Sequence, residues 1–157
     1  MSFYVTRRGA MALGAGAFVA AVSARPRPAL AKNDAQELIK AFAGGKEAAL
    51  GRVKLDLPEI AENGNTVPMT VSVDSPMTAE SYVTDVLVLA DGNPRAGVVA
   101  FRFTPLSGVA EANTRIRLAE TQNIIALAKM NDGSVFRAEK EVKVTIGGCG
   151  GQFAPRA

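Results

Sequence analysis

Alternation of apolar and polar residues with a period of two is the feature that most constrains the fold of this chain. In residues 53–57 and 67–73, apolar side chains occupy every second position. Successive side chains of a β-strand point to opposite faces, so this period indicates strands with one buried side. Pro68 cannot donate a ladder hydrogen bond, which places the second of these strands at a sheet edge.

The rest of the chain up to residue 146 continues the pattern. Residues 82–90 are apolar on both faces toward their end, which predicts a central strand. The turn Asp91-Gly92-Asn93-Pro94 follows. Further strands are indicated by inward-facing Val99, Phe101 and Phe103, by Ile116 and Leu118, by the apolar run 124–130 and by the long alternating run 136–146.

About seven strands without helix-sized crossovers predict an all-β fold, an immunoglobulin-like antiparallel β-sandwich. The chain has one cysteine and no tryptophan, so it is not an antibody-type domain with an inter-sheet disulfide. We expect one sandwich domain over residues 32–146.

A short helix is expected before the strands. Asp34 is its predicted N-cap, with Glu37 reaching back to it, and Gly44-Gly45 ends it. Its apolar face is formed by Leu38, Ile39 and Phe42, and residues 46–50 are expected to add one more turn.

Residues 1–31 are predicted to be a cleavable export signal. Arg7 and Arg8 precede an uncharged run rich in alanine and glycine, and Ala29 and Ala31 form an A-x-A cleavage site. The arginine pair favours the twin-arginine route, which carries folded cargo, over an ordinary secretory signal. The run is too short for a membrane span, and no lipid-anchor cysteine follows it, so a periplasmic protein without a membrane anchor is expected.

Composition excludes several classes of function. Removal of the signal leaves 14 basic against 15 acidic side chains, so nothing indicates nucleic-acid binding. There is no histidine, which rules out a Ser-His-Asp triad, a Cys-His pair and a zinc site of His and Cys within this chain. An all-carboxylate metal site remains open, although no acidic cluster has calcium-loop spacing. We expect no metal, no cofactor and no catalysis by the chain alone.

The lone Cys149 stands between two glycine pairs, Gly147-Gly148 and Gly150-Gly151, directly after the last strand. Glycine contributes no packing and loses the most conformational entropy on ordering, so residues 147–157 are predicted to form a flexible arm. Three extended residues past Ile146 place the sulfur about 10 Å beyond the sheet. That reach suits entry into a pocket of another protein.

The residues alone leave three uses of Cys149 open. It is a covalent carrier or redox thiol, it links a structural or interaction module into a disulfide dimer, or it is a tail residue without a role. Without a nearby cation the thiol is a poor nucleophile by itself, so a partner has to supply charge, metal or oxidant.

Several features together resemble the SoxY family of periplasmic sulfur-carrier subunits in thiosulfate oxidation, over nearly the whole chain. They are the twin-arginine-like start, the segment LPEIAENGNTVPMTVSV (57–73), the strand pattern and VTIGGCGG (144–151). The resemblance implies that Cys149 is the attachment point for thiosulfate-derived sulfur, on a swinging arm of Gly147, Gly148, Gly150 and Gly151.

The resemblance also implies partners. A haem-containing enzyme would couple thiosulfate to the thiol, a metal-dependent hydrolase would release sulfate, and a sulfane dehydrogenase would oxidise the remaining sulfur. A smaller sandwich subunit, SoxZ, would form a heterodimer with this chain and cross the membrane with it. Residues 152–157 depart from the family, whose chains normally stop near the last glycine. This tail puts free passage into a narrow pocket in doubt.

Overall fold

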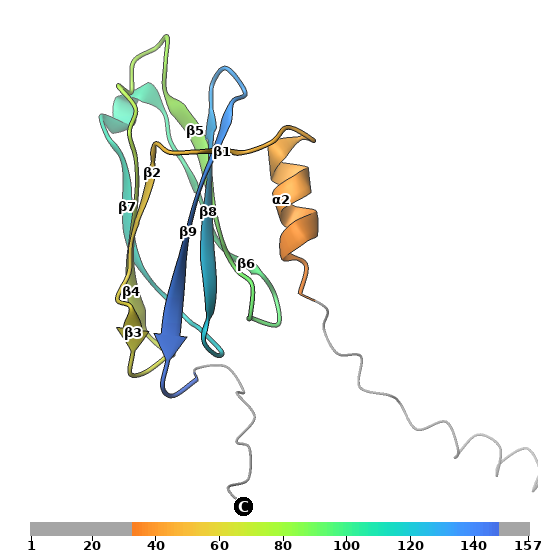
Figure 1. Cartoon of the computed structure of the whole chain (residues 1–157). Helices are drawn as coiled ribbons and strands as arrows, with labels where there is room; N and C mark the ends of the chain where they lie inside the picture. The colour runs from red at the N-terminus through yellow and green to blue at the C-terminus, as the bar shows by residue number, and fades with distance from the viewer. Residues whose placement is uncertain (1–32, 148–157) are drawn as a thin grey trace, which may run out of the picture. The chain divides into compact units, whose positions relative to one another are not determined.

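The computed structural model describes residues 33–147, which form two packed β-sheets, one α-helix and the short 3-10 helix η1 (Pro105–Ser107) (Figure 1). The larger sheet has the order β1-β9-β8-β5-β6, and β3 also pairs with β9. The smaller sheet has the order β2-β4-β7. The predicted β-sandwich is therefore confirmed, with nine strands instead of about seven. The bounds of the larger sheet are β1 Ala49–Leu50, β3 Ile60–Ala61, β5 Val83–Ala90, β6 Gly97–Arg102, β8 Gln122–Met130 and β9 Val135–Val144.

The smaller sheet consists of β2 (Val53–Asp56), β4 (Val67–Val73) and β7 (Ala110–Ile116). Burial in β4 alternates strictly from Val67 to Val73, as the period-two pattern predicts. The placement of Pro68 at a sheet edge was wrong, because β4 is the middle strand. Its neighbour β2 ends opposite Thr70, so Pro68 is paired only with Arg115 of β7 and no ladder bond is required on its other side.

The two additional strands arise because residues 49–61 cross between the sheets. β1 pairs in parallel with the start of β9, β2 joins the smaller sheet, and β3 returns to pair in parallel with the end of β9. Lys140 Nζ of β9 donates a hydrogen bond to the carbonyl of Leu57 at 2.6 Å, which holds the crossing segment against β9. The expected helical turn over residues 46–50 was wrong, since Ala49 and Leu50 take backbone partners from β9 instead.

The core lies between the sheets and contains most of the predicted inward residues. The central position predicted for residues 82–90 is confirmed, because β5 lies between β8 and β6. Ile116 and Leu118 are buried, and Phe101 and Phe103 pack against the core from β6 and the residue after it. The largest fully buried side chains are Met69, Leu89, Leu118, Ile124, Leu127, Val67, Val71, Val83, Val86, Val88 and Val142.

The predicted helix is α2 (Ala35–Ala43), which covers the outer face of the larger sheet (Figure 1). Leu38, Ile39 and Phe42 pack against a second apolar cluster of Leu89, Ile125 and Leu127, as their spacing predicts. Gly44 ends the helix in the left-handed conformation, with φ of 60°.

The predicted capping box at the start of α2 is absent. The Asp34 side chain makes no cap bond, and its Oδ1 accepts from the backbone N–H of Ala96 at 2.9 Å. Asn33 Oδ1 accepts from the N–H of Ala35 instead. Asp34 thus links the helix to the β5–β6 turn, a tertiary contact that local sequence rules do not contain.

Truncation of Leu89 tests the packing of α2 on the sheet. Leu89 is fully buried between the sheet and the helix. Leu89→Ala is expected to lower the free energy of unfolding by about 2–5 kcal/mol, through lost apolar transfer and a residual cavity. Leu106→Ala is the matched control, since Leu106 is 97% exposed and should change stability by less than about 0.5 kcal/mol. Urea unfolding of both variants gives the comparison, and equal values would contradict this packing.

Candidate functional site

The end of β9, from which the predicted arm departs, is held by residues 59–64. The N–H of Lys143 donates to Glu59 O at 2.9 Å, and the N–H of Thr145 donates to Ala61 O at 3.0 Å. Beyond the strand, Ile146 O accepts from the N–H of Gly64 at 2.7 Å. Backbone hydrogen bonds therefore continue to Ile146, one residue before the first arm glycine.

Residues 59–64 are themselves fixed to the rest of this end. Gly64 is buried, and its carbonyl accepts from the N–H of Leu118, itself fully buried, at 2.8 Å. Asn63 Oδ1 accepts from the N–H of Asn65 at 2.9 Å, a local Asx turn. On the other side of β9, Thr121 Oγ1 accepts from the N–H of Val144 at 3.0 Å. The base of the arm is thus held from both sides.

Only one of the predicted site residues lies within the described part of the chain, and the others lie outside it. Gly147 is described and is exposed. Cys149 and Gly148, Gly150 and Gly151 lie outside the described residues, as do Arg7, Arg8, Ala29 and Ala31. Their roles stay predictions, while the attachment point of the arm is defined by the structure.

A polar network in the neighbouring loops makes this end of the sandwich rigid. Gln122, which pairs with Val142 near the end of β9, is only 5% exposed. Its Oε1 accepts from the N–H of Gly92 at 2.8 Å, and its Nε2 donates to Asn93 Oδ1 at 3.0 Å. A Cβ on Gly92 would lie 2.9 Å from the Cβ of Gln122, so the turn approaches too closely for a side chain there.

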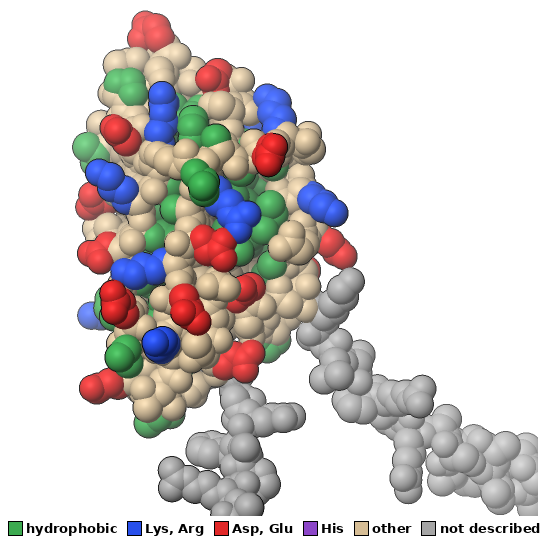
Figure 2. All heavy atoms as spheres, viewed as in Figure 1, with side chains coloured by type: hydrophobic (Ala, Val, Ile, Leu, Met, Phe, Trp, Pro, Cys, Tyr) green, Lys and Arg blue, Asp and Glu red, His purple; other side chains and the backbone are tan. Residues whose placement is uncertain are grey.

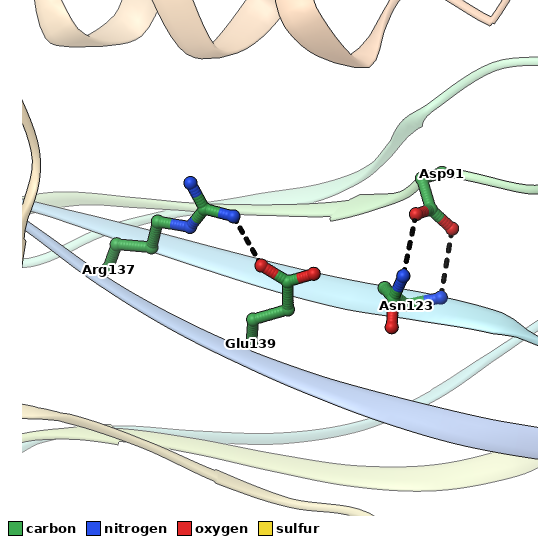
Figure 3. Close-up of polar contacts among 4 residues, drawn as sticks. All are labelled: Asp91, Asn123, Arg137 and Glu139. Atoms are coloured by element: carbon green, nitrogen blue, oxygen red, sulfur yellow. Dashed lines mark hydrogen bonds and ion pairs between the residues drawn. The ribbon is translucent and has the colours of Figure 1, made fainter.

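The same turn is attached to β8 by a second pair of side chains (Figure 3). Asp91 Oδ1 accepts from the N–H of Asn123 at 2.8 Å, and Asp91 Oδ2 accepts from Asn123 Nδ2 at 3.0 Å. Sequence reasoning identified Asp91-Gly92-Asn93-Pro94 as a turn and missed these partners. They are distant in sequence, so only the strand register brings them together.

Acidic side chains outnumber basic ones around the base of the arm. Figure 2 shows acidic side chains over the lower part of the viewed face, where β9 ends. Exposed glutamates flank β3, precede β8 and lie on β9, and the basic side chains in the same region are those of Arg117, Lys140 and Lys143. These glutamates are Glu59, Glu62, Glu120 and Glu141.

The clearest electrostatic perturbation in the described residues lies elsewhere. In the β8–β9 turn, the hydroxyl and the N–H of Ser134 donate to Asp132 Oδ1 and hold the pKa of that carboxyl below its usual value. This turn precedes β9, whereas the arm follows it, so Asp132 lies at the opposite end of that strand.

Over residues 33–147 no group of three or more Asp, Glu, His or Cys side chains could hold a metal ion. No helix within that range has the length and apolarity to cross a membrane.

Hydrogen exchange tests where the ordered strand ends. The N–H groups of Lys143, Thr145 and Gly64 are expected to be protected, because each donates to a backbone carbonyl at this end. The amide of Gly147 is expected to exchange near the rate of an unstructured peptide. Residue-resolved exchange is followed by NMR. Protection of Gly147 equal to that of Thr145 would show that the ordered backbone extends beyond Ile146.

Comparison with known proteins identifies relatives of this sandwich. The family model of the sulfur oxidation protein SoxY matches residues 39–149, so the match extends to Cys149. The structure of the sulfur carrier protein SoxY from Chlorobium limicola f thiosulfatophilum is similar with a TM-score of 0.60 and 29% identity. The similarity covers 74% of this chain and 96% of that one. No curated protein sequence matches.

More distant structures share the fold. The superoxide reductase (neelaredoxin) of Ignicoccus hospitalis is 20% identical with a TM-score of 0.54, over 60% of this chain and 80% of that one. The superoxide reductase of Nanoarchaeum equitans is 12% identical with a TM-score of 0.52, over 61% of this chain and all of that one. At these identities the likeness concerns the fold alone. The family match covers most of the chain and agrees with the carrier structure, and the chain belongs to the SoxY family of sulfur oxidation proteins.

Proposed function

We propose that this chain is a periplasmic, non-enzymatic carrier that binds sulfur intermediates covalently on Cys149 and presents them to partner enzymes. The main support is the abrupt change at the end of β9. Backbone hydrogen bonds hold the chain through Ile146, and the sequence Gly-Gly-Cys-Gly-Gly follows at once. Membership of the SoxY family gives this arrangement its sulfur chemistry.

A fixed base followed by a narrow, flexible arm suits the delivery of bound sulfur to several enzymes. The fixed base defines where the arm starts, and three extended residues carry the sulfur about 10 Å from it. The flanking glycines add no side chain, so the arm stays narrow on both sides of the thiol. A group that acts within its own active site needs packed neighbours that hold it still, which glycines do not provide.

The proposed chemistry on Cys149 has three steps. The thiol and thiosulfate join to form a cysteine S-thiosulfonate, with release of one proton and two electrons to a haem-containing partner. Water then attacks the terminal sulfonate group in a hydrolase partner. This cleaves the bond between the outer and the middle sulfur, releases sulfate and protons, and leaves a persulfide on Cys149. A sulfane dehydrogenase then takes six electrons from the outer sulfur of the persulfide, which gains three oxygen atoms from water, releases protons and becomes a cysteine S-sulfonate.

The scaffold supports a carrier role because it offers little for these reactions by itself. The chain has no histidine to serve as a base, and glutamates outnumber cations around the arm base. A dianionic substrate needs cations beside it, and these would line the pockets of the partners. The proposal has three further parts. The chain is exported by a signal that contains Arg7 and Arg8, the signal is cleaved after Ala31, and the mature chain forms a heterodimer with a SoxZ-like subunit.

Replacement of the thiol is the direct test. Cys149→Ser is expected to abolish thiosulfate-dependent electron transfer to the haem partner in a reconstituted system, because no bond to sulfur can form. The unfolding midpoint of the variant should match the unaltered chain. Intact mass of protein isolated from the periplasm should show thiosulfonate or persulfide adducts on Cys149. Full activity of the serine variant would refute the carrier role, and a Cys149 disulfide dimer without sulfur adducts would favour a structural module.

Widening of the arm gives a separate test. Gly148→Val and Gly150→Val are expected to lower kcat/KM for the coupling reaction by about tenfold or more, since a branched side chain beside the thiol obstructs a narrow pocket and misplaces the sulfur. The matched control Gln152→Val adds the same bulk beyond the glycines. Alkylation of Cys149 by a small reagent should proceed equally in all three variants. Unchanged coupling in both glycine variants would show that the arm does not enter a narrow channel.

A further inference from the structure

Asn63 is the only asparagine in the sequence that precedes a glycine. Asparagine is a chemically labile residue, because a backbone nitrogen can attack its side-chain amide. The attacking nitrogen belongs to the next residue, and a glycine there has no side chain to obstruct the approach. Asn63 is therefore the asparagine whose sequence most favours deamidation. The residues that follow the other asparagines are all bulkier, namely Asp34, Thr66, Pro94, Thr114, Ile124 and Asp132.

The side chain of Asn63 is held in a position that suits this attack. Its Oδ1 accepts a hydrogen bond from the N–H of Asn65 at 2.9 Å, so the carboxamide lies along the backbone of Gly64. A donor on the carbonyl oxygen draws electrons from Cγ and stabilises the negative charge that develops on Oδ1 during attack. Asn63 is also exposed, so water can reach its amide and ammonia can leave.

The nucleophile, in contrast, is restrained by the base of the arm. The N–H of Gly64 donates to the carbonyl of Ile146 at 2.7 Å, and the carbonyl of Gly64 accepts from the N–H of Leu118 at 2.8 Å. Gly64 is itself buried. Attack requires the nitrogen to lose its proton and the peptide group to turn toward Cγ of Asn63, so the hydrogen bond to Ile146 has to open first. The same contact that fixes the arm base therefore limits the reactivity of Asn63.

We propose that Asn63 is a deamidation site whose reactivity is controlled by the hydrogen bond between Gly64 and Ile146 at the arm base. When this bond opens, the Gly64 nitrogen forms a bond to Cγ of Asn63 and gives up its proton. The bond between Cγ and Nδ2 breaks, and the side-chain nitrogen leaves with that proton as ammonia. One water molecule then opens the resulting succinimide to aspartate or isoaspartate. No oxidant, reductant or second protein is required.

Deamidation alters the base from which the predicted arm departs. Both products place a new carboxylate beside the exposed Glu62. Isoaspartate also routes the backbone through the former side chain, which adds one methylene group before Gly64 and shifts its N–H and carbonyl away from Ile146 and Leu118. The modification therefore loosens the attachment of the end of β9. It depends on backbone contacts and not on the sulfur chemistry of Cys149.

A proline at the arm base tests this control. Thr145→Pro removes the N–H that donates to Ala61 O at 3.0 Å, next to the hydrogen bond of Gly64, and leaves Asn63 unaltered. Thr145→Ala is the matched control, because it removes the same exposed side chain and keeps the N–H. The chain without its signal and both variants are incubated at mildly alkaline pH, and deamidation of each asparagine is followed by peptide mass spectrometry. Asn63 should deamidate roughly fivefold faster in the proline variant, the factor that corresponds to loss of one typical hydrogen bond, and at the unaltered rate in the alanine variant.

Hydrogen exchange of the Gly64 amide provides a second measurement that needs no variant. In the unaltered chain, urea below the unfolding transition should raise the exchange rate of Gly64 and the deamidation rate of Asn63 in parallel, because both require the same opening. Thermal unfolding shows whether the variants fold, and the urea series decides alone if the proline variant does not.

Three results would each overturn the proposal. The first is an equal deamidation rate of Asn63 in the proline and alanine variants. The second is faster deamidation at another asparagine of the folded chain. The third is a deamidation rate that stays constant in urea while exchange of the Gly64 amide rises. Sulfur transfer is measured separately, so failure of this inference leaves the proposed carrier function open.

Discussion

The pairing of β9 on both of its sides is the constraint on which the rest of this structure depends. One side forms a ladder with β8 over residues 135–142, and the other receives β1 at its start and β3 at its end. Val142 is fully buried from the same strand, so displacement of β9 would cost core packing as well as hydrogen bonds. The predicted arm follows directly from a strand that is paired on both sides, which defines where the arm begins.

The hydrogen-bonded loops beside the arm base and the edge strand β6 lie in separate parts of the sandwich. The network of Gln122, Asn93 and Asp91 holds the loops beside the arm base, and Gly64 connects that base to Leu118. The edge strand β6 lies at the far side of the same sheet. Within the larger sheet, β8 and β5 separate that edge from β9.

The sequence predicts those parts of the fold that local periodicity determines. The bounds of β4, the central position of β5 and the apolar face of α2 followed from spacing alone. β1 and β3 could not be predicted, because two residues show no period and both strands form only against β9. Asp34 was assigned to a local cap, whereas its partner Ala96 lies 62 residues away. Cys149 was predicted as the site from its glycine neighbours, and it lies outside the described residues, so its role stays a prediction.

Electrostatics explain why such a thiol would be handled by other proteins. Cations beside a thiol favour its reactive thiolate form, and exposed glutamates lie near the arm base. In the proposed carrier, coupling would be favourable where a partner pocket supplies cations that stabilise both the thiolate and the incoming anion. The reactivity of Cys149 would then be set by the partner and not by the surface of this chain.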